Sequence, residues 1–584
     1  MTMGRELPVI ASARDVRWGQ DADMDAWLHH FKTENNIEHL MNPEHVASDE
    51  QLKFMVALDE QQVFIPCSDE ILMCLMEEKP SGDLMREYGR IWLHTVRLIR
   101  KHAFNMYHER KVRAFCRLRF KTHLSSRIMI PSRLLKRMNS IVLTQCSLVD
   151  PSDEDKMEEN RRAFEYINKP ATDRMLYATP SECMYNPDVR NLRSELDSIE
   201  LLRLMYLSTL PALWSSSTPS YLDVEKAINA PCPTAHSMEV LLGSEKDERK
   251  TILFLPESSG GIVFDLFFIR ALLRQGHKVI LALKEGFLFD SPTFWDAMQD
   301  PVLVELCKGA KMVSNDTITK NLLLALLRSH RFLIISDGMR EKLNLYKTNV
   351  TFSRAWKECD VVFAKGAENY DNLINCGHSF TRDVLGYYRK KDGTFVLEAK
   401  PRAGNVRKFS EEAINAMANR IIETMRKEKE KGRSVMFYSA VIGSIPGETD
   451  TAIKVVNTFV AHLRSRLDST FIINPAEHFE EGMDGDDLMF MWEQVQRSGL
   501  LDVWRFQTVE DIETSFTLLD RKVPSIWSGK DSTFSTGCTK EMRIALDVQK
   551  KNPELQIIGP SSEKFFRRAE YGVGKYYDAG ITSM

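Results

Sequence analysis

The sequence lacks most features of secreted, membrane-spanning and zinc-ribbon proteins. Its 10 cysteines stand singly, and none forms the close Cys-x-x-Cys pair of a zinc ribbon or a redox motif. Residues 1–25 contain no apolar core ahead of a small-residue cleavage site, so a secretory signal is not expected. No stretch approaches the roughly 18 uninterrupted apolar residues of a spanning helix. We therefore expect a reduced, cytoplasmic protein with no membrane partner.

Length and net charge limit the number of domains and the partners that we expect. The chain of 584 residues is too long for one ordinary core, and roughly two to four domains are expected. A net charge of −4 gives no overall attraction for nucleic acid, so a nucleic acid partner is not expected either. The glycine-containing segment 443–450 has no Gly-Lys-Ser/Thr and is therefore not a Walker A loop. It remains either a structural turn or an anion-binding loop.

Short apolar runs alternate with helix-length segments in the middle of the chain. The runs lie at 251–256, 278–283, 331–336 and 360–364. This alternation is typical of βαβ units that build a parallel sheet buried on both faces. The sequence therefore predicts an α/β fold with a Rossmann-like, mostly parallel sheet. The expected parts are a helical N-terminal region at 1–240, the sheet domain at 241–400 and a further α/β segment of open role at 401–584.

Charged residues follow the predicted strands of the sheet. Glu257 follows the first run, Glu285 and Asp290 follow the second, Asp337 follows the third and Lys365 follows the fourth. Because the carboxyl ends of parallel strands meet at one edge of a sheet, we expect these side chains to lie close together. Carboxylates bind hard cations and a lysine neutralises phosphate charge. The pattern predicts a site for a cation and a phosphate. The alternative is that these residues are polar only because the loops that follow strands lie at the surface.

Three motifs in this stretch resemble the damage-control phosphatase family, which includes acidic-residue methyltransferase-like proteins. The motifs are Glu257-Ser258-Ser259-Gly260, Phe287-Leu288-Phe289-Asp290 and Lys365-Gly366-Ala367-Glu368-Asn369-Tyr370. The resemblance implies hydrolysis of a small phosphorylated metabolite with a divalent metal, namely Mn, Co, Ni or Mg. It also implies metal ligands at Asp290, Glu257 and Asp265, and catalytic roles for Lys365 and Asn369.

The first motif departs from the family pattern, which has Asp-Asn where this chain has Glu257-Ser258. Glutamate keeps the carboxylate but reaches one methylene further, and serine is a weaker, neutral oxygen donor. Asp265 is the candidate that replaces the missing ligand. Two alternatives to a phosphatase therefore stay open. One is a catalytically degenerate member that binds a phosphorylated ligand or a partner protein, and the other is a methyl- or group-transferase.

A β-hairpin is predicted after the resembling stretch, with strands at 384–388 and 394–398 and a turn at Asp392-Gly393. The run from Lys400 to Arg407 follows and carries three cations near a glycine. Arg402 within it is a candidate for binding the phosphate. The alternative is that the run forms an exposed turn.

The most basic part of the chain lies at 97–121, where cations alternate with apolar residues. The cations are Arg97, Arg100, Lys101, Arg110, Lys111, Arg113, Arg117, Arg119 and Lys121. Such a segment either binds a polyanion or forms an amphipathic helix whose basic face is solvated or pairs with acidic neighbours, such as those at 153–159.

Overall fold

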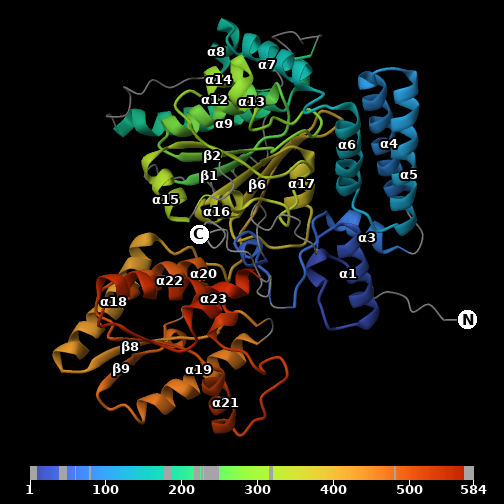
Figure 1. Cartoon of the computed structure of the whole chain (residues 1–584). Coiled ribbons are helices and arrows are strands. Elements are labelled where there is room, and N and C mark those ends of the chain that lie inside the picture. The colour runs from blue at the N-terminus through green and yellow to red at the C-terminus, as the bar shows by residue number, and fades with distance from the viewer. Residues whose placement is uncertain are drawn as a thin grey trace, which may run out of the picture. The chain divides into compact units, whose positions relative to one another are not determined.

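The computed structural model divides the chain into two compact units, Met1–Ala403 and Gly404–Met584 (Figure 1). The residues that it describes are 10–37, 49–59, 61–77, 81–176, 187–215, 224, 228, 238, 249–314, 318, 320–445, 448–478, 480, 482–483 and 485–570. Each unit has its own sheet and is described separately. The boundaries at 240 and 400 that the sequence suggested stay predictions.

A seven-stranded sheet forms the centre of the first unit. Its strands are β1 (Thr251–Leu255), β2 (Lys278–Leu283), β3 (Lys311–Val313), β4 (Phe332–Ser336), β5 (Val361–Lys365), β6 (Asp383–Arg389) and β7 (Phe395–Lys400). Their order is β3-β4-β2-β1-β5-β6-β7, and only β7 is antiparallel to its neighbour. The predicted mostly parallel α/β sheet and the predicted hairpin are confirmed. β3 was not predicted, because it has three residues of which only Val313 is buried.

Some helices of the first unit precede this sheet in the chain, and others connect its strands. They are α1 (Ala22–Glu34), α2 (Asp49–Leu52), α3 (Asp69–Met76), α4 (Gly82–His102), α5 (Met106–Ser126), α6 (Pro131–Cys146), α7 (Asp153–Ile167), α8 (Pro170–Leu176), α9 (Pro187–Ser208), α12 (Gly261–Arg274), α13 (Asp296–Gln299), α14 (Pro301–Leu306), α15 (Lys320–Ser329), α16 (Val350–Glu358) and α17 (Ala367–Leu373). Among the described helices, none is both long and apolar enough to cross a membrane.

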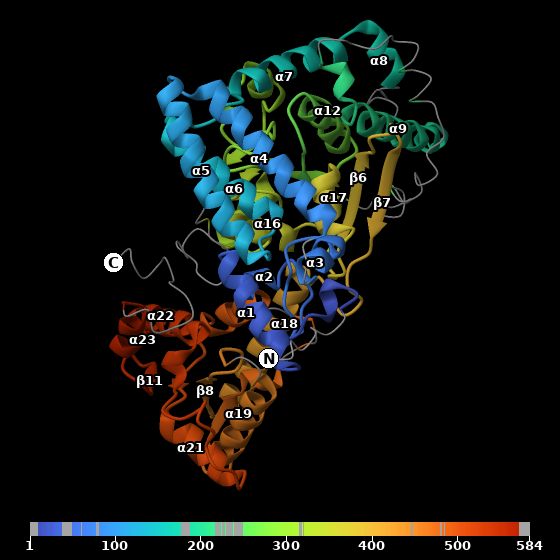
Figure 2. The same cartoon turned by 90° about the vertical axis from the view of Figure 1, so that its right-hand side faces the viewer.

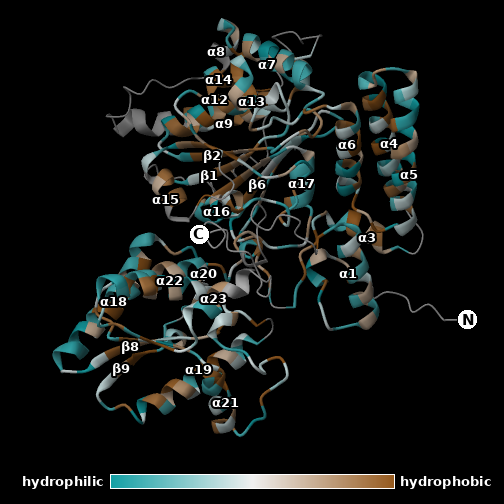
Figure 3. Ribbon diagram, in the orientation of Figure 1, coloured by the Kyte–Doolittle hydropathy of each residue, from teal (hydrophilic) through white to brown (hydrophobic). Residues whose placement is uncertain are grey.

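Both faces of the sheet are buried, because successive residues of each strand point to opposite sides. Along β1, Ile252 and Phe254 join a core shared with α9 and α12, whereas Leu253 and Leu255 join a core shared with α16. All four side chains are at most 5% exposed. Figures 1 and 2 show helices on both sides of the strands, and Figure 3 shows brown, hydrophobic strands between them. This two-sided burial explains why the strands read as continuous apolar runs.

The N-terminal helices α1 and α3 to α6 build a further core of their own (Figure 2). Ser68 and Ser81 cap α3 and α4 by accepting hydrogen bonds from backbone N–H groups in the first turn. Two residues from the sheet region, Phe287 and Leu288, also belong to this helical core. The loop after β2 is therefore anchored in the helical region and not only in the sheet.

An ion pair with almost no solvent exposure also joins the helical region to the loops of the sheet. Arg133 Nη1 of α6 lies 2.5 Å from Glu341 Oε1, and the two side chains are 4% and 0% exposed. Arg133 Nε also donates to the carbonyl of Asn35 at 2.8 Å.

The second unit contains a smaller parallel sheet in the order β11-β10-β8-β9. Its elements are α18 (Glu411–Glu430), β8 (Ser434–Ser439), α19 (Thr449–Arg464), β9 (Thr470–Ile473), α20 (Gly485–Gln496), β10 (Val503–Phe506), α21 (Val509–Leu518), α22 (Thr536–Lys551), β11 (Gln556–Ile558) and α23 (Ser562–Glu570). The described 3₁₀ turns of the chain are η1 (Ala13–Asp15), η3 (Pro211–Leu213), η4 (Pro475–Glu477) and η5 (Ser532–Phe534). The predicted C-terminal α/β segment is therefore confirmed. Within the glycine-containing segment 443–450, residues 446 and 447 lie outside the described part.

The Arg133–Glu341 pair generates a stability prediction. Arg133→Met leaves Glu341 as a buried charge with only the partly exposed Lys136 at 3.7 Å, so we expect the first unit to lose about 3 kcal/mol of unfolding free energy. The double variant Arg133→Met/Glu341→Leu removes both charges and should recover most of that loss. Urea denaturation of the three proteins measures the effect, and a single variant as stable as wild type would contradict it.

Candidate active site

The carboxyl ends of β1 and β5 bring Glu257 and Lys365 to one edge of the first sheet. Leu255 of β1 pairs with Ala364 of β5, so the residues that follow each strand are neighbours. The half-buried Glu257 side chain crosses the backbone of Gly366, which has a φ of +97°. A Cβ atom at Gly366 would lie 2.5 Å from Glu257 Cδ. Glycine is thus required here both by its conformation and by the approach of the carboxylate.

Lys365 forms an ion pair with Asp265 of α12 in the interior. Lys365 Nζ lies 2.8 Å from Asp265 Oδ2, and neither side chain has any exposed surface. The Nζ atom also lies close to the start of α12, since a Cβ at Gly261 would be 2.6 Å from it. Among the described residues, the hydroxyl of Tyr387 and Oδ1 of Asp265 have no hydrogen-bond partner of good geometry. Asp265 is therefore present at the site, but its Oδ2 is bonded to Lys365.

The loop after β2 places Asp290 beside the first motif. Ser259 donates to the carbonyl oxygen of Asp290 from its N–H at 2.8 Å and from its Oγ at 2.7 Å. Phe289, just before Asp290, has a φ of +51°, a conformation that costs energy in a residue with a side chain. The structure thus brings Glu257, Asp290 and Lys365 together at one edge, as the strand-end pattern predicted.

The carboxylates of the site repel one another. The pKa of Glu257 is raised by burial and by the charges of Glu368 and Asp290, against the lowering effect of Lys365. Asp290 keeps exposed surface, but the protein atoms around its carboxyl raise its pKa, as does the charge of Glu368, against the lowering effect of Lys156 and Lys365. The negative charges are therefore only partly compensated by the cations of the structure.

Two acidic residues of this group were not predicted from the sequence. Glu368 follows Ala367 at the start of α17 and forms an ion pair of 3.0 Å with Lys342. Glu159 of α7 has a buried Oε2 with no hydrogen-bond partner in the described part of the chain. Burial, the charge of Asp290 and that of Asp155 raise the pKa of Glu159 to about 7.

A signal for Glu159 was present in the sequence. The sequence offered the segment 153–159 only as acidic neighbours for the basic segment 97–121, yet the buried face of α7 includes Lys156, Asn160 and Ala163. Glu159 lies three or four residues from two of these, and thus at the border of the buried face. Its neighbour Asn160 accepts a 2.7 Å hydrogen bond from the N–H of Gly260, which ties α7 to the first motif.

The donor set fits a hard divalent cation only in part. Glu257 and Asp290 offer carboxylate oxygens whose mutual repulsion a cation would relieve. Within the described residues, however, no three His, Cys, Asp or Glu side chains are grouped closely enough to hold a metal by themselves. The residues fit a cation that is held by these two carboxylates and whose coordination shell is completed by oxygens of a phosphate and of water. Mg²⁺ adopts this arrangement in many phosphate sites.

Asn369 and Arg402, the other two predicted site residues, have different positions. Asn369 of α17 is half-buried and donates from Nδ2 to the carbonyl of Lys365 at 2.8 Å, so it lies at the site. Arg402 is exposed and follows β7, which runs antiparallel to β6, with Lys400 paired to Val384. Its N–H donates to Asp383 at the start of β6. Arg402 is therefore at the opposite edge of the sheet from Lys365.

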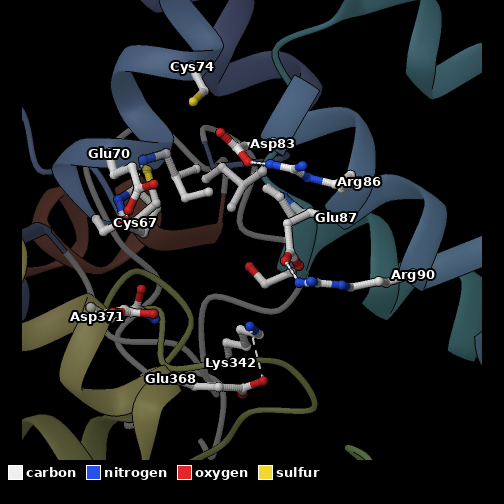
Figure 4. Close-up of a pocket in the computed structure, with 17 residues that line it drawn as sticks. Cys67, Glu70, Cys74, Asp83, Arg86, Glu87, Arg90, Lys342, Glu368 and Asp371 are labelled. Carbon is white, nitrogen blue, oxygen red and sulfur yellow. Dashed lines mark hydrogen bonds and ion pairs between the residues drawn. The ribbon is translucent and has the colours of Figure 1, made fainter. Parts of the chain in front are cut away.

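A cavity of about 440 Å³ adjoins the carboxylates (Figure 4). Its charged lining residues are Glu70, Asp83, Arg86, Glu87, Arg90, Lys342, Glu368 and Asp371. Figure 4 shows Lys342 directed at Glu368, with the Arg90–Glu87 pair of α4 facing them across the cavity. Glu257 and Asp290 do not line the cavity, but Glu368 does, and its charge raises the pKa of both of these carboxylates.

The raised pKa of Glu257 predicts how the stability of the protein changes when a neutral side chain replaces this carboxyl. A carboxyl whose folded pKa exceeds its unfolded value destabilises the fold as pH rises above the unfolded value. We expect Glu257→Gln to raise the melting temperature of metal-free protein by roughly 2 °C at pH 8 and to have no effect near pH 4. The exposed Glu305→Gln is the control. Differential scanning fluorimetry across this pH range checks the sign, and a lower melting temperature at pH 8 would contradict it.

Comparisons with known proteins find a matching family model and a similar solved structure. Residues 216–397 match the family model of the damage-control phosphatase ARMT1-like domain. A crystal structure of a DUF89 family protein from Pyrococcus horikoshii is similar over 52% of this chain and 90% of that chain, with 16% identity and a TM-score of 0.37. No curated protein matches the chain. The chain thus carries a damage-control phosphatase ARMT1-like domain at residues 216–397.

Proposed function

We propose that this protein is a metal-dependent phosphatase that acts on a small phosphorylated metabolite. The observation that carries the proposal is the convergence of Glu257, Asp290 and Glu368 at the carboxyl edge of the first sheet, with raised pKa values for the first two. A site that keeps repelling carboxylates together favours a cation as its ligand. The match of residues 216–397 to a phosphatase domain points to the same chemistry.

In this proposal Glu257 and Asp290 hold the cation, which would be Mn²⁺, Co²⁺, Ni²⁺ or Mg²⁺. When bound, a divalent cation supplies Lewis-acid polarisation of the phosphoryl group and lowers the pKa of a bound water. Lys365 has no exposed surface, so it acts as a fixed positive charge behind the carboxylates. The Asp265 carboxylate holds that charge in place, and Asn369 holds the end of β5 through the Lys365 carbonyl.

The cavity beside α17 is the proposed place for the non-reacting part of the metabolite. Its volume of about 440 Å³ lies in the range of small-molecule sites. Lining groups of both signs, such as Arg90, Lys342 and Asp371, suit a polar ligand with several hydrogen-bonding groups.

A second candidate function is a catalytically degenerate relative that binds a phosphorylated ligand or partner without turnover. Ser258 favours it, because serine stands where the family has an asparagine oxygen. The lack of a three-residue metal group among the described residues favours it too. Calorimetry distinguishes the two functions: metabolite binding that needs no metal and releases no phosphate supports the second.

The first test is phosphate release by full-length protein from sugar phosphates and phosphopantetheine-like compounds with each of the four metals. We expect turnover in wild type and a loss of roughly 100-fold in Asp290→Asn, because the amide cannot replace the charge of the carboxylate. The matched control is Asp392→Asn, an exposed position in the hairpin turn. Equal rates in wild type and Asp290→Asn would remove Asp290 from the mechanism.

A second test uses the pKa of Glu159, which is about 7. Below that pH the carboxyl carries a proton in the folded protein, and a cation nearby favours its loss. We expect the Mn²⁺ affinity to rise between pH 5.5 and 8. Each pH unit below pH 7 should lower it about tenfold, because protons compete with the metal ion. Glu159→Gln should flatten this part of the profile. Isothermal titration calorimetry in buffers of different ionisation enthalpy detects the released proton, and equal profiles for both proteins would exclude this role.

A further inference from the structure

The outer face of α5 combines basic and apolar side chains. One side of the helix carries residues that are three or four positions or whole turns apart, namely Tyr107, Arg110, Lys111, Leu118 and Lys121. All five are exposed, Tyr107 by 77% and Leu118 by 63%. Figure 3 shows hydrophilic and hydrophobic residues alternating along this helix.

The opposite side of α5 is the one that packs on the protein. Val112 and Cys116 have no exposed surface and belong to the core of the N-terminal helices. The outer face is therefore not needed to hold the helix in place. Substitutions there leave the packing of α5 on α4 and α6 intact.

Further apolar side chains extend this face at the turn between α4 and α5. Phe104 is 71% exposed and Met106 is 65% exposed. Together with Tyr107 and Leu118 they form a set of large apolar side chains at one end and along one side of the helix. We call this set, with Arg110, Lys111, Arg117 and Lys121, the α5 face. A group of exposed apolar side chains on a soluble surface marks an interaction site.

The charge of the α5 face has one sign. Glu109 is the only acidic residue of α5, and it forms ion pairs with Arg113 and Arg100. In the described part of the chain no acidic side chain pairs with Arg117 or Lys121, although these two lie one turn apart and repel each other. Arg161 of α7, by contrast, is paired with Glu158 and Glu165. In a chain with a net charge of −4, this face is a local excess of positive charge.

We propose that the α5 face docks on an anionic lipid surface. Cations and large apolar side chains share one exposed side of α5, and a lipid surface offers anionic headgroups to the first and an acyl boundary to the second. The cations attract anionic headgroups, while Phe104, Met106 and Leu118 enter the acyl boundary. A single-stranded nucleic acid would satisfy the cations and stack bases on Phe104, but it would leave the aliphatic Met106 and Leu118 in water. The lipid surface accounts for both parts of the face, and this contact needs no spanning helix.

The test is co-sedimentation of the full-length protein with vesicles of phosphatidylcholine alone or with roughly 30% phosphatidylserine at about 0.1 M salt. We expect binding to the anionic vesicles and none to the neutral ones. Lys111→Gln/Lys121→Gln should weaken binding roughly 25-fold, since each basic residue near the surface contributes about fivefold. Phe104→Ser/Leu118→Ser should weaken it as well, because the apolar anchors are lost.

Matched controls lie in the second unit. Lys522→Gln/Lys551→Gln removes two exposed cations, and Leu518→Ser removes an exposed leucine, so both should bind as wild type does. Circular dichroism verifies that every variant is folded. Equal binding by wild type and both α5 variants would overturn the proposal, as would absence of binding to anionic vesicles. Binding of single-stranded RNA by the α5 face without vesicle binding would overturn it in favour of a nucleic acid partner.

Discussion

The buried ion pair between Lys365 and Asp265 is the contact on which the candidate active site depends. Neither side chain has exposed surface, and each lies 2.8 Å from the other's opposite charge, which offsets part of the cost of burying it. The pair joins the last residue of β5 to α12, the helix that follows the first motif. The pair therefore holds the backbone beside Gly366, which the Glu257 side chain approaches. Within the pair, Lys365 supplies the positive charge that favours the nearby carboxylates of Glu257 and Asp290.

The rest of the site is energetically unfavourable without a ligand. Glu257, Asp290 and Glu368 repel one another, Glu159 has a buried oxygen with no hydrogen-bond partner among the described residues, and Phe289 has a left-handed backbone conformation. Each feature costs stability in the free protein, and Lys365 of β5 offsets the repulsion at Glu257 and Asp290 only in part. Such local costs are expected where a protein keeps groups ready for a ligand, and the well-packed cores on both faces of the sheet offset them.

The sequence predicted the parts of the site that follow from strand order along the chain. Glu257, Asp290 and Lys365 each come after a continuous apolar run, and parallel pairing then places them at one edge. Arg402 was expected there too, but β7 runs back along β6 and returns the chain to the other edge. Asp265 was correctly placed near the site, while its pairing with Lys365 depends on a contact between residues 100 positions apart. Glu159 was not predicted for the same reason, because only tertiary packing brings α7 beside Asp290.

The anchoring of Phe287 and Leu288 in the core of the N-terminal helices has a consequence for how this protein could change over evolution. Asp290, two residues after Leu288, is held in position by apolar contacts outside the sheet. Replacing the helical part by an unrelated module, or losing it, would release the loop and with it one side of the candidate active site. The two parts are therefore expected to be inherited together, and substitutions in the helical core would need matching changes at these two side chains.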